Sequence, residues 1–189
     1  VPRPGGVDYR ESDSQHQGYA VMDLVYEYRT GIGTDIHRLA PDLILKLGGI
    51  EVPFDRGLLG HSDADVALHA LMDALLGAAG MGDIGVLYPD TEPQWKGADS
   101  RALLLGVKEK IQKERWEVVN VDLTVHAEQP KLGPYKGQMK RSIAGLLDID
   151  FAHVNIKAKT EEGLGPVGQG EAMAATAVAL LRRRIKRTL

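Results

Sequence analysis

The sequence of 189 residues contains no cysteine. Disulfide bonds and metal sites built from thiolates are therefore excluded, and any zinc ion has to be held by histidine and carboxylate side chains. An excess of positive charge is missing as well, because 23 lysine and arginine residues face 26 aspartate and glutamate residues, for a net charge of −3. This balance argues against a large nucleic-acid-binding surface, although it leaves room for a local phosphate pocket.

Long apolar runs are also scarce. The longest one near the end, residues 172–181, is too short to span a bilayer and is followed by three arginines. Residues 1–24 are polar, contain proline and glycine, and lack the apolar centre of a secretory signal. We therefore expect neither a membrane nor a nucleic acid as a partner.

The composition is that of an ordinary folded domain, with 43% apolar and 26% charged residues. Residues 1–24 show no periodicity and are expected to form a disordered extension, while residues 25–189 are expected to form a single domain. The extension is either a leader remnant or residues left from expression. We expect a cytoplasmic protein of a bacterium, or a plastid protein if residues 1–24 are a leader remnant.

The apolar pattern of the rest of the chain predicts its elements. Residues 25–32 alternate as a strand, residues 43–54 predict a hairpin about Gly48-Gly49, and residues 57–60 predict a loop. Helices are predicted over 64–77, 100–114, 135–147 and 172–184, and strands over 116–126 and 154–158. This order predicts an α/β (α+β) sandwich, with one small mixed sheet and helices on one face. A second subunit would then cover the other face.

Two segments carry candidate metal ligands. Asp35 and His37 alternate along an extended segment, so their side chains leave it on the same face. His69 and Asp73 are four residues apart on the helix predicted over 64–77 and share one of its faces. A carboxylate and two imidazoles from Asp35, His37 and His69 would make a three-ligand site with an open fourth position, the arrangement of catalytic zinc. Taken one at a time, each of these residues is equally compatible with a structural role.

Several longer motifs carry a family resemblance. In order along the chain they are Gly33-Thr-Asp35-Ile-His37-Arg-Leu, residues 61–80, Gly82-Asp83-Ile-Gly85, Tyr88-Pro-Asp90-Thr-Glu-Pro, Lys96-Gly-Ala-Asp99-Ser and Asn155-Ile-Lys157-Ala. Together they resemble the family of 2-C-methyl-D-erythritol 2,4-cyclodiphosphate synthases, enzymes of the non-mevalonate route to isoprenoid precursors. The resemblance extends from about Arg29 to Leu181.

The resemblance implies a homotrimer whose three sheets surround an axis, with active sites between subunits. It also implies a reaction on a small cytidine diphosphate substrate, 4-diphosphocytidyl-2-C-methyl-D-erythritol 2-phosphate, whose 2-phosphate attacks the β-phosphorus while CMP leaves. The nucleophile is already an anion, so no strong base is needed. Charge neutralisation and enforced proximity then dominate the catalysis.

The resemblance also assigns roles to residues. Asp35, His37 and His69 would hold Zn²⁺, and Glu162 would hold Mg²⁺ or Mn²⁺. His61 and Thr160 match positions that stabilise the transition state. The implied substrate contacts are Asp35, Ile36, His37, His61, Ser62, Asp83, Ile84, Gly85, Tyr88, Pro89, Asp90, Thr91, Glu92, Ala127, Glu128, Gln129, Pro130, Lys131, Leu132, Gly133, Lys159, Thr160, Glu161 and Glu162.

Four further residues are interpreted as supporting the structure. Asp73 is expected to orient His69, Ser100 to cap a helix together with Asp99, and His126 to be structural.

The chain departs from the family pattern at two places. Lys159-Thr160-Glu161-Glu162 stands where the family usually has three threonines and a glutamate, and Gln169 stands where it usually has an arginine. That arginine lines one end of the trimer axis, where prenyl diphosphates are found in the family. A neutral amide is a poor substitute for a bidentate guanidinium. We therefore expect weak or no farnesyl diphosphate binding at the axis, as calorimetric titration of the protein and of Gln169→Arg would measure; tight binding to both would contradict this.

Two other functions remain open from the sequence. A metal-dependent phosphohydrolase would use the same ligands to activate water, and it would release a free monophosphate instead of a ring and CMP. A non-enzymatic trimeric nucleotide-binding module with structural zinc would need a closed fourth ligand, for which the chain offers no cysteine and no better-placed histidine.

Overall fold

The computed structural model describes residues 25–185. The extension predicted for residues 1–24 lies outside the described residues. A five-stranded mixed sheet has the order β4-β1-β7-β5-β6, in which the β5–β6 pair alone is parallel. Its strands are β1 (Val25–Pro41), β4 (Arg56–Leu59), β5 (Glu117–His126), β6 (Val154–Lys159) and β7 (Ala172–Ile185). The hairpin predicted about Gly48-Gly49 is present as β2 (Lys46–Leu47) and β3 (Ile50–Glu51).

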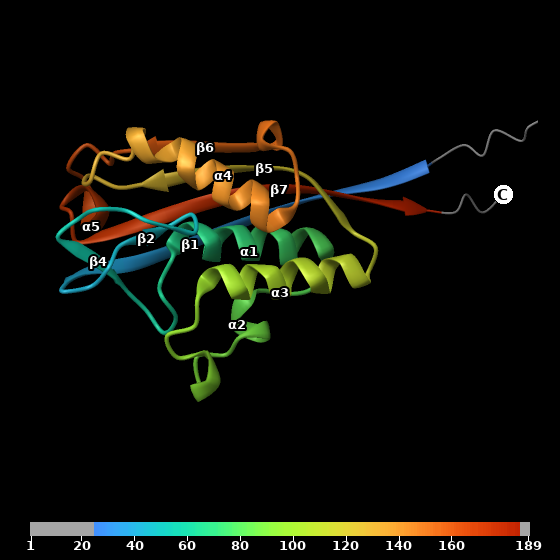
Figure 1. The fold of residues 1–189 in the computed structure, drawn as a ribbon, viewed down its shortest axis with the longest axis horizontal. Helices are drawn as coiled ribbons and strands as arrows, with labels where there is room; N and C mark the ends of the chain where they lie inside the picture. Colours follow the sequence, from blue (N-terminus) through green and yellow to red (C-terminus); the bar gives the residue numbers. More distant parts are fainter. Residues whose placement is uncertain (1–24, 186–189) are drawn as a thin grey trace, which may run out of the picture.

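Three longer helices cover one face of the sheet (Figure 1). They are α1 (Val66–Ala79), α3 (Ser100–Lys113) and α4 (Lys136–Leu147), and they agree with the predictions to within a few residues. Helix α1 packs on β1 and β7, α4 packs on β6, and α3 lies against α1. Two single-turn helices, α2 (Ile84–Leu87) and α5 (Gly165–Gly168), fall in glycine-containing segments for which the apolar pattern predicts neither a helix nor a strand. The predicted sandwich with helices on one face is confirmed.

The C-terminal element differs from its prediction, because residues 172–184 form the central strand β7 and not a helix. Every second side chain of this strand is buried under the helices, from Met173 to Leu181. Alanine favours helices in isolation, but here small side chains let α1 lie close to the sheet while the backbone pairs with strands on both sides. Tertiary packing overrides the local preference.

A second, smaller difference concerns the loop predicted for residues 57–60. Residues Arg56–Leu59 form the edge strand β4, which pairs antiparallel with the end of β1. This strand has only four residues and includes Gly57, with Gly60 directly after it. So short a run does not show the alternation of apolar and polar residues that identifies a strand in a sequence.

Two glycines of β1 set how closely α1 approaches the sheet. A Cβ atom at Gly33 would lie 2.1 Å from the Ala70 carbonyl oxygen and 2.6 Å from the Ala74 nitrogen, and Gly31 meets the next turn of α1 in the same way. The helix backbone itself occupies the space of a side chain, so nothing can rotate aside. These glycines therefore fix the position of the helix that carries His69.

We expect Gly33→Ala to lower the free energy of unfolding by about 3 kcal/mol, because α1 has to move off the sheet to admit the methyl group. The matched control is Gly145→Ala in α4, where an added Cβ meets nothing within 4 Å. That change should stabilise the protein by about 0.5–1 kcal/mol through helix propensity alone. Urea unfolding of both variants measures the difference, and equal stability of Gly33→Ala and the unmodified protein would contradict the packing argument.

The start of α1 is tied to the β2–β3 hairpin by the buried side chain of Asp65. Its carboxylate accepts hydrogen bonds from the backbone of Leu68 at 3.0 Å, Gly48 at 2.9 Å and Gly49 at 2.7 Å. Burial raises the pKa of Asp65, and the three amide donors act in the opposite direction. The helix begins at Val66 and not at Ala64, whose φ of 58° is left-handed.

The face of the sheet opposite the helices is uncovered in the described part of the chain. Ile32, Ile36 and Val178 point outward with 67%, 56% and 43% of their surfaces exposed, and Ile32 pairs directly with Val178. Toward β6 this face becomes polar, with Lys157 bonded to Asp122 at 2.6 Å. Among the described residues no helix has the length and apolarity needed to cross a membrane.

Candidate metal centre and active site

The structure brings Asp35, His37 and His69 together at the junction of β1 and α1. The Asp35 Oδ2 atom lies 2.9 Å from His37 Nε2 and 2.9 Å from His69 Nδ1, and the two nitrogens lie 3.1 Å apart. The imidazole rings meet edge to face, with centroids 5.1 Å apart. Strand alternation places the first two side chains on the helix-covered face, and the glycine contacts of β1 bring His69 down onto them.

These three side chains could hold one metal ion. Tetrahedral zinc with bonds of about 2.0–2.1 Å places its ligand atoms about 3.3 Å from one another, close to the separations found here. Two imidazole nitrogens and one carboxylate oxygen are the donor set of catalytic zinc sites, in which a fourth position is left for water or substrate. The donor chemistry therefore fits a divalent ion.

The charges of the cluster also favour a cation. Burial acts to raise the pKa of Asp35, but its contacts with His37 and His69 outweigh burial and hold that pKa well below its usual range. Burial acts to lower the pKa of His37, and the hydrogen bond and charge of Asp35 outweigh it and raise that pKa. A carboxylate that stays ionised between two imidazoles supplies a full negative charge to the site.

The second ring nitrogen of His69 has partners that sequence analysis did not assign to it. Its Nε2 atom lies 2.9 Å from Ser62 Oγ and 3.0 Å from Ser100 Oγ. Asp73, predicted to orient His69, instead accepts a hydrogen bond at 2.8 Å from the backbone of Ile84. Asp99 caps α3 through the amide of Arg101, as predicted, whereas Ser100 turns its hydroxyl toward His69.

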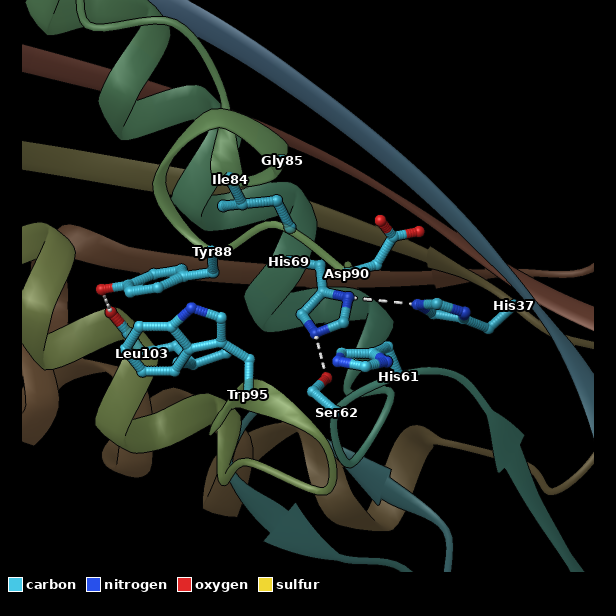
Figure 2. A pocket seen from close by; sticks show the side chains of 10 residues that line it. All are labelled: His37, His61, Ser62, His69, Ile84, Gly85, Tyr88, Asp90, Trp95 and Leu103. Carbon is cyan, nitrogen blue, oxygen red and sulfur yellow. Dashed lines mark hydrogen bonds between the residues drawn. The ribbon is translucent and has the colours of Figure 1, made fainter. Parts of the chain in front are cut away.

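A cavity of about 400 Å³ opens beside this cluster (Figure 2). His37, His61, Ser62 and His69 lie at one end, and Tyr88 and Trp95 form an aromatic wall at the other, with ring centroids 4.9 Å apart. The Tyr88 hydroxyl donates to the Leu103 carbonyl at 2.9 Å, which fixes its ring. The complete lining is His37, His61, Ser62, His69, Ile84, Gly85, Tyr88, Asp90, Trp95 and Leu103.

Seven of the ten lining residues are predicted substrate contacts and His69 is a predicted metal ligand, whereas Trp95 and Leu103 were not assigned a role. Trp95 directly precedes Lys96, the first residue of a family motif, and this position is the feature of the sequence that could have identified Trp95 as a site residue. Among the described residues, His61 Nε2 and Trp95 Nε1 are buried polar atoms without a hydrogen-bond partner. Such atoms are rare in folded proteins, and here both belong to side chains that line the cavity. Each is available to a ligand that enters it.

The remaining predicted substrate residues lie outside this cavity. Asp83 caps α2 by accepting from the Val86 amide at 3.0 Å. Ile36 points to the open face of the sheet, and Pro89, Thr91 and Glu92 are exposed or partly exposed on the segment after Tyr88. Figure 2 shows Asp90 behind the His69 ring, at the edge of the cavity.

A second group of predicted residues gathers at the ends of the parallel strands β5 and β6. It comprises Ala127–Gly133 and Lys159–Glu162. The Glu128 carboxylate accepts from the Glu161 amide at 2.8 Å, and Thr160 Oγ1 donates to Glu162 Oε1 at 2.6 Å. His126, interpreted as structural, pairs with Glu161. His126 and Glu161 line a hollow of about 410 Å³ together with Asp35, so this group borders the metal cluster from the side of β5 and β6.

The segment with the missing arginine has a cation from another element beside it. Gln169 ends the short helix α5, and the guanidinium of Arg56 on β4 donates to the Gly170 carbonyl at 2.8 Å.

A mixed α/β fold with a His/His/carboxylate cluster beside a ligand-sized cavity defines a protein that can hold a metal ion next to a small molecule. Residues 28–182 match the model of the YgbB family, and the chain belongs to that family. The 2-C-methyl-D-erythritol 2,4-cyclodiphosphate synthase of Bordetella petrii is 55% identical over 156 residues, which are 82% of this chain and 96% of the relative.

Two solved structures share the fold. A 2C-methyl-D-erythritol-2,4-cyclodiphosphate synthase in a CDP-bound form superimposes with a TM-score of 0.75 at 38% identity, covering 81% of this chain and 99% of that one. The IspF of Plasmodium falciparum in a CDP complex gives a TM-score of 0.73 at 32% identity, covering 84% and 97%.

Proposed function

We propose that the protein is a phosphorus–oxygen lyase that cyclises 4-diphosphocytidyl-2-C-methyl-D-erythritol 2-phosphate to 2-C-methyl-D-erythritol 2,4-cyclodiphosphate. An oxygen of the 2-phosphate bonds to the β-phosphorus, the bond between that phosphorus and the bridging oxygen breaks, and CMP leaves with the bridging oxygen. The observation that carries the proposal is the Asp35/His37/His69 cluster beside the cavity, in a chain 55% identical to a synthase of this reaction.

The metal ligands are Asp35, His37 and His69 for Zn²⁺, and Glu162 for Mg²⁺ or Mn²⁺. When bound, these ions neutralise phosphate charge and act as a template that aligns the reacting groups. The oxygen donor of Glu162 suits the harder ions, and its partner Thr160 holds the carboxylate in place.

The chain itself binds and orients the substrate. His61 has a ring nitrogen without a hydrogen-bond partner beside the cavity. This nitrogen is suited to hydrogen-bond a phosphate oxygen as negative charge develops on that oxygen during the reaction. Ser62 lies next to His61, the segment Asp83–Gly85 contacts the ribose, and Tyr88–Glu92 surrounds the methylerythritol. The loop Ala127–Gly133 receives the cytosine, and Lys159 adds a cation for phosphate.

We further propose a homotrimer, with the open faces of three sheets around an axis. The apolar patch of Ile32, Ile36 and Val178 provides the surface for such an assembly. The lining of the cavity beside His69 (the pocket group) includes no residue of the loop around Glu162 (the loop group), and in this proposal the loop of a neighbouring copy completes each site. The matching relatives include bacterial proteins, and a cytoplasmic location belongs to the same proposal.

The direct test is to incubate the purified protein with the cytidyl substrate and follow the phosphorus NMR spectrum. A synthase yields the cyclic diphosphate together with CMP in equal amounts. A metal-dependent phosphohydrolase acting at the same cluster would instead release inorganic phosphate or a free monophosphate, and no cyclic diphosphate would form. A nucleotide-binding module would leave the spectrum unchanged, and either of these outcomes would reject the proposal.

A separate prediction concerns Glu162. We expect Glu162→Gln to raise the Mg²⁺ or Mn²⁺ concentration needed for half-maximal activity by about tenfold or more, because the neutral amide loses the charge that attracts a hard cation. The zinc content should stay at the level of the unmodified protein. Metal analysis and an activity titration measure the two effects, with Glu114→Gln, which changes an exposed carboxylate at the end of α3, as the control. Loss of zinc from Glu162→Gln would mean that the two metal sites have been exchanged.

A further inference from the structure

A chain of hydrogen bonds leads from the metal cluster through the buried Ser100 to Lys46 on β2, whose side chain is partly exposed. It begins at His69 Nε2, passes to Ser100 Oγ at 3.0 Å, and continues to the Asp63 carboxylate, whose Oδ1 atom lies 2.5 Å from the same hydroxyl. It ends at Lys46 Nζ, 3.3 Å from the other oxygen of Asp63. His69 is 7% exposed and Ser100 is fully buried, so water does not compete for the bond between these two side chains.

The donors and acceptors of this chain can be assigned in only one consistent way. The carboxylate of Asp63, paired with a lysine, has no proton to give, so Ser100 has to donate its single hydroxyl proton to Asp63. Ser100 can then only accept from His69, which requires the proton of the neutral ring to be on Nε2. This leaves the lone pair of Nδ1 directed at Asp35 and His37, where a metal ligand is needed.

Two other groups contact the His69 ring and show why its proton has to be held on Nε2. The Asp35 carboxylate lies 2.9 Å from Nδ1 and would by itself attract the ring proton to that atom. Ser62 also lies near Nε2, but its hydroxyl already accepts from the Ala64 amide at 3.2 Å and can still turn its own proton toward the ring. Ser62 therefore tolerates either tautomer, whereas Ser100 tolerates one.

We propose that Ser100 and Asp63 are positioning residues that hold His69 in its Nε2-protonated tautomer, and so keep Nδ1 ready to bind the metal ion of the active site. The inference rests on the metal site of the proposed function. It also gives the motif Lys96–Ser100 a role, because Gly97 and Ala98 of the same segment bond to the backbone of His61 and Asp63 at 2.7 and 3.0 Å. The loop that carries His61 and Ser62 is thereby anchored to the start of α3.

The first measurement is zinc affinity by competition with a chromophoric chelator. Ser100→Ala should bind zinc 10- to 100-fold more weakly, the range typical for partners of ligating histidines, and Ser100→Thr, which restores the hydroxyl, should recover most of the loss. Asp63→Asn should weaken zinc binding in the same direction, because an amide can donate to Ser100 and release the serine proton toward His69. Asp63→Asn also tests the same chain if Ser100→Ala fails to fold.

The second measurement is independent of metal and of substrate. Nitrogen-15 NMR of the metal-free protein, at a pH where the imidazoles are neutral, reports which nitrogen of His69 carries the proton. Ser100→Ala should shift the population from the Nε2 toward the Nδ1 tautomer, and Ser62→Ala should shift it less. An unchanged tautomer with zinc affinity within twofold in Ser100→Ala, or a larger shift in Ser62→Ala, would overturn the assignment. A protein that shows the shift and does not cyclise the substrate would reject the proposed reaction alone.

Discussion

Replacing His69 with alanine is expected to abolish stoichiometric zinc binding and to reduce the turnover number by on the order of 10³-fold or more. The unmodified protein should carry about one zinc ion per chain, because three protein ligands converge on one point. Two remaining ligands, on a strand whose Asp35 would then pair only with His37, are too few to retain the ion during purification. The measurement is metal analysis by mass spectrometry together with the rate of CMP release.

Asp73→Asn is the matched control for His69→Ala. Asp73 is one turn further along α1, is partly buried, and bonds to the Ile84 amide instead of to the cluster. Its replacement should leave the zinc content at one ion per chain. Equal zinc in the unmodified protein and in His69→Ala would show that the ion binds elsewhere.

The second large effect concerns the division of the site between subunits. His69→Ala removes the pocket group of one copy, and Glu162→Ala removes the loop group, so each variant alone should lose activity by on the order of 10³-fold. In mixed trimers made by co-expression, one interface in four joins an intact pocket to an intact loop of the neighbouring copy. About a quarter of the unmodified activity should therefore return.

The control for this experiment is a mixture of two variants from the same group. His37→Ala combined with His69→Ala leaves no interface with an intact pocket, so no activity should return. If the mixture of His69→Ala and Glu162→Ala also stays inactive although it contains mixed trimers, each site is built from a single chain. An affinity tag on only one of the two variants, and recovery of the untagged variant with it, establishes that mixed trimers have formed.

Much of the fold could be predicted from the sequence because its elements have clear periods. The helix from Val66, the hairpin about Gly48-Gly49 and the strand of residues 117–126 were found where apolar residues recur at the spacing of a helix or a strand. The strand β7 could not be read in the same way, because alanine carries little period and favours helices. Its alternation of buried and exposed side chains can be recognised as that of a strand only once β1 and β5 are known to pair with it on either side.

The residues of the candidate site likewise fall into those that could be predicted from the sequence and those that could not. Asp35 and His37 follow from strand alternation, and His69 follows from its place on a helix beside them, so the cluster could be predicted as a metal site. The contact between Ser100 and His69 could not, because it joins residues 31 positions apart whose approach depends on how α3 packs against α1. The place of Trp95 in the cavity wall could not be predicted for a similar reason, because the Tyr88 ring that it packs against lies on the other side of a turn-rich segment.

The proposed enzyme needs one metal ion held by Asp35, His37 and His69 within a site completed by a second copy. Anomalous diffraction at the zinc edge, from crystals grown with CDP, tests this in a single data set. We expect one peak per chain between the three side chains, with the diphosphate beside it and the cytosine against residues 127–133 of the neighbouring copy. A peak at Glu162 in place of this one, or a nucleotide bound entirely within one chain, would contradict this expectation.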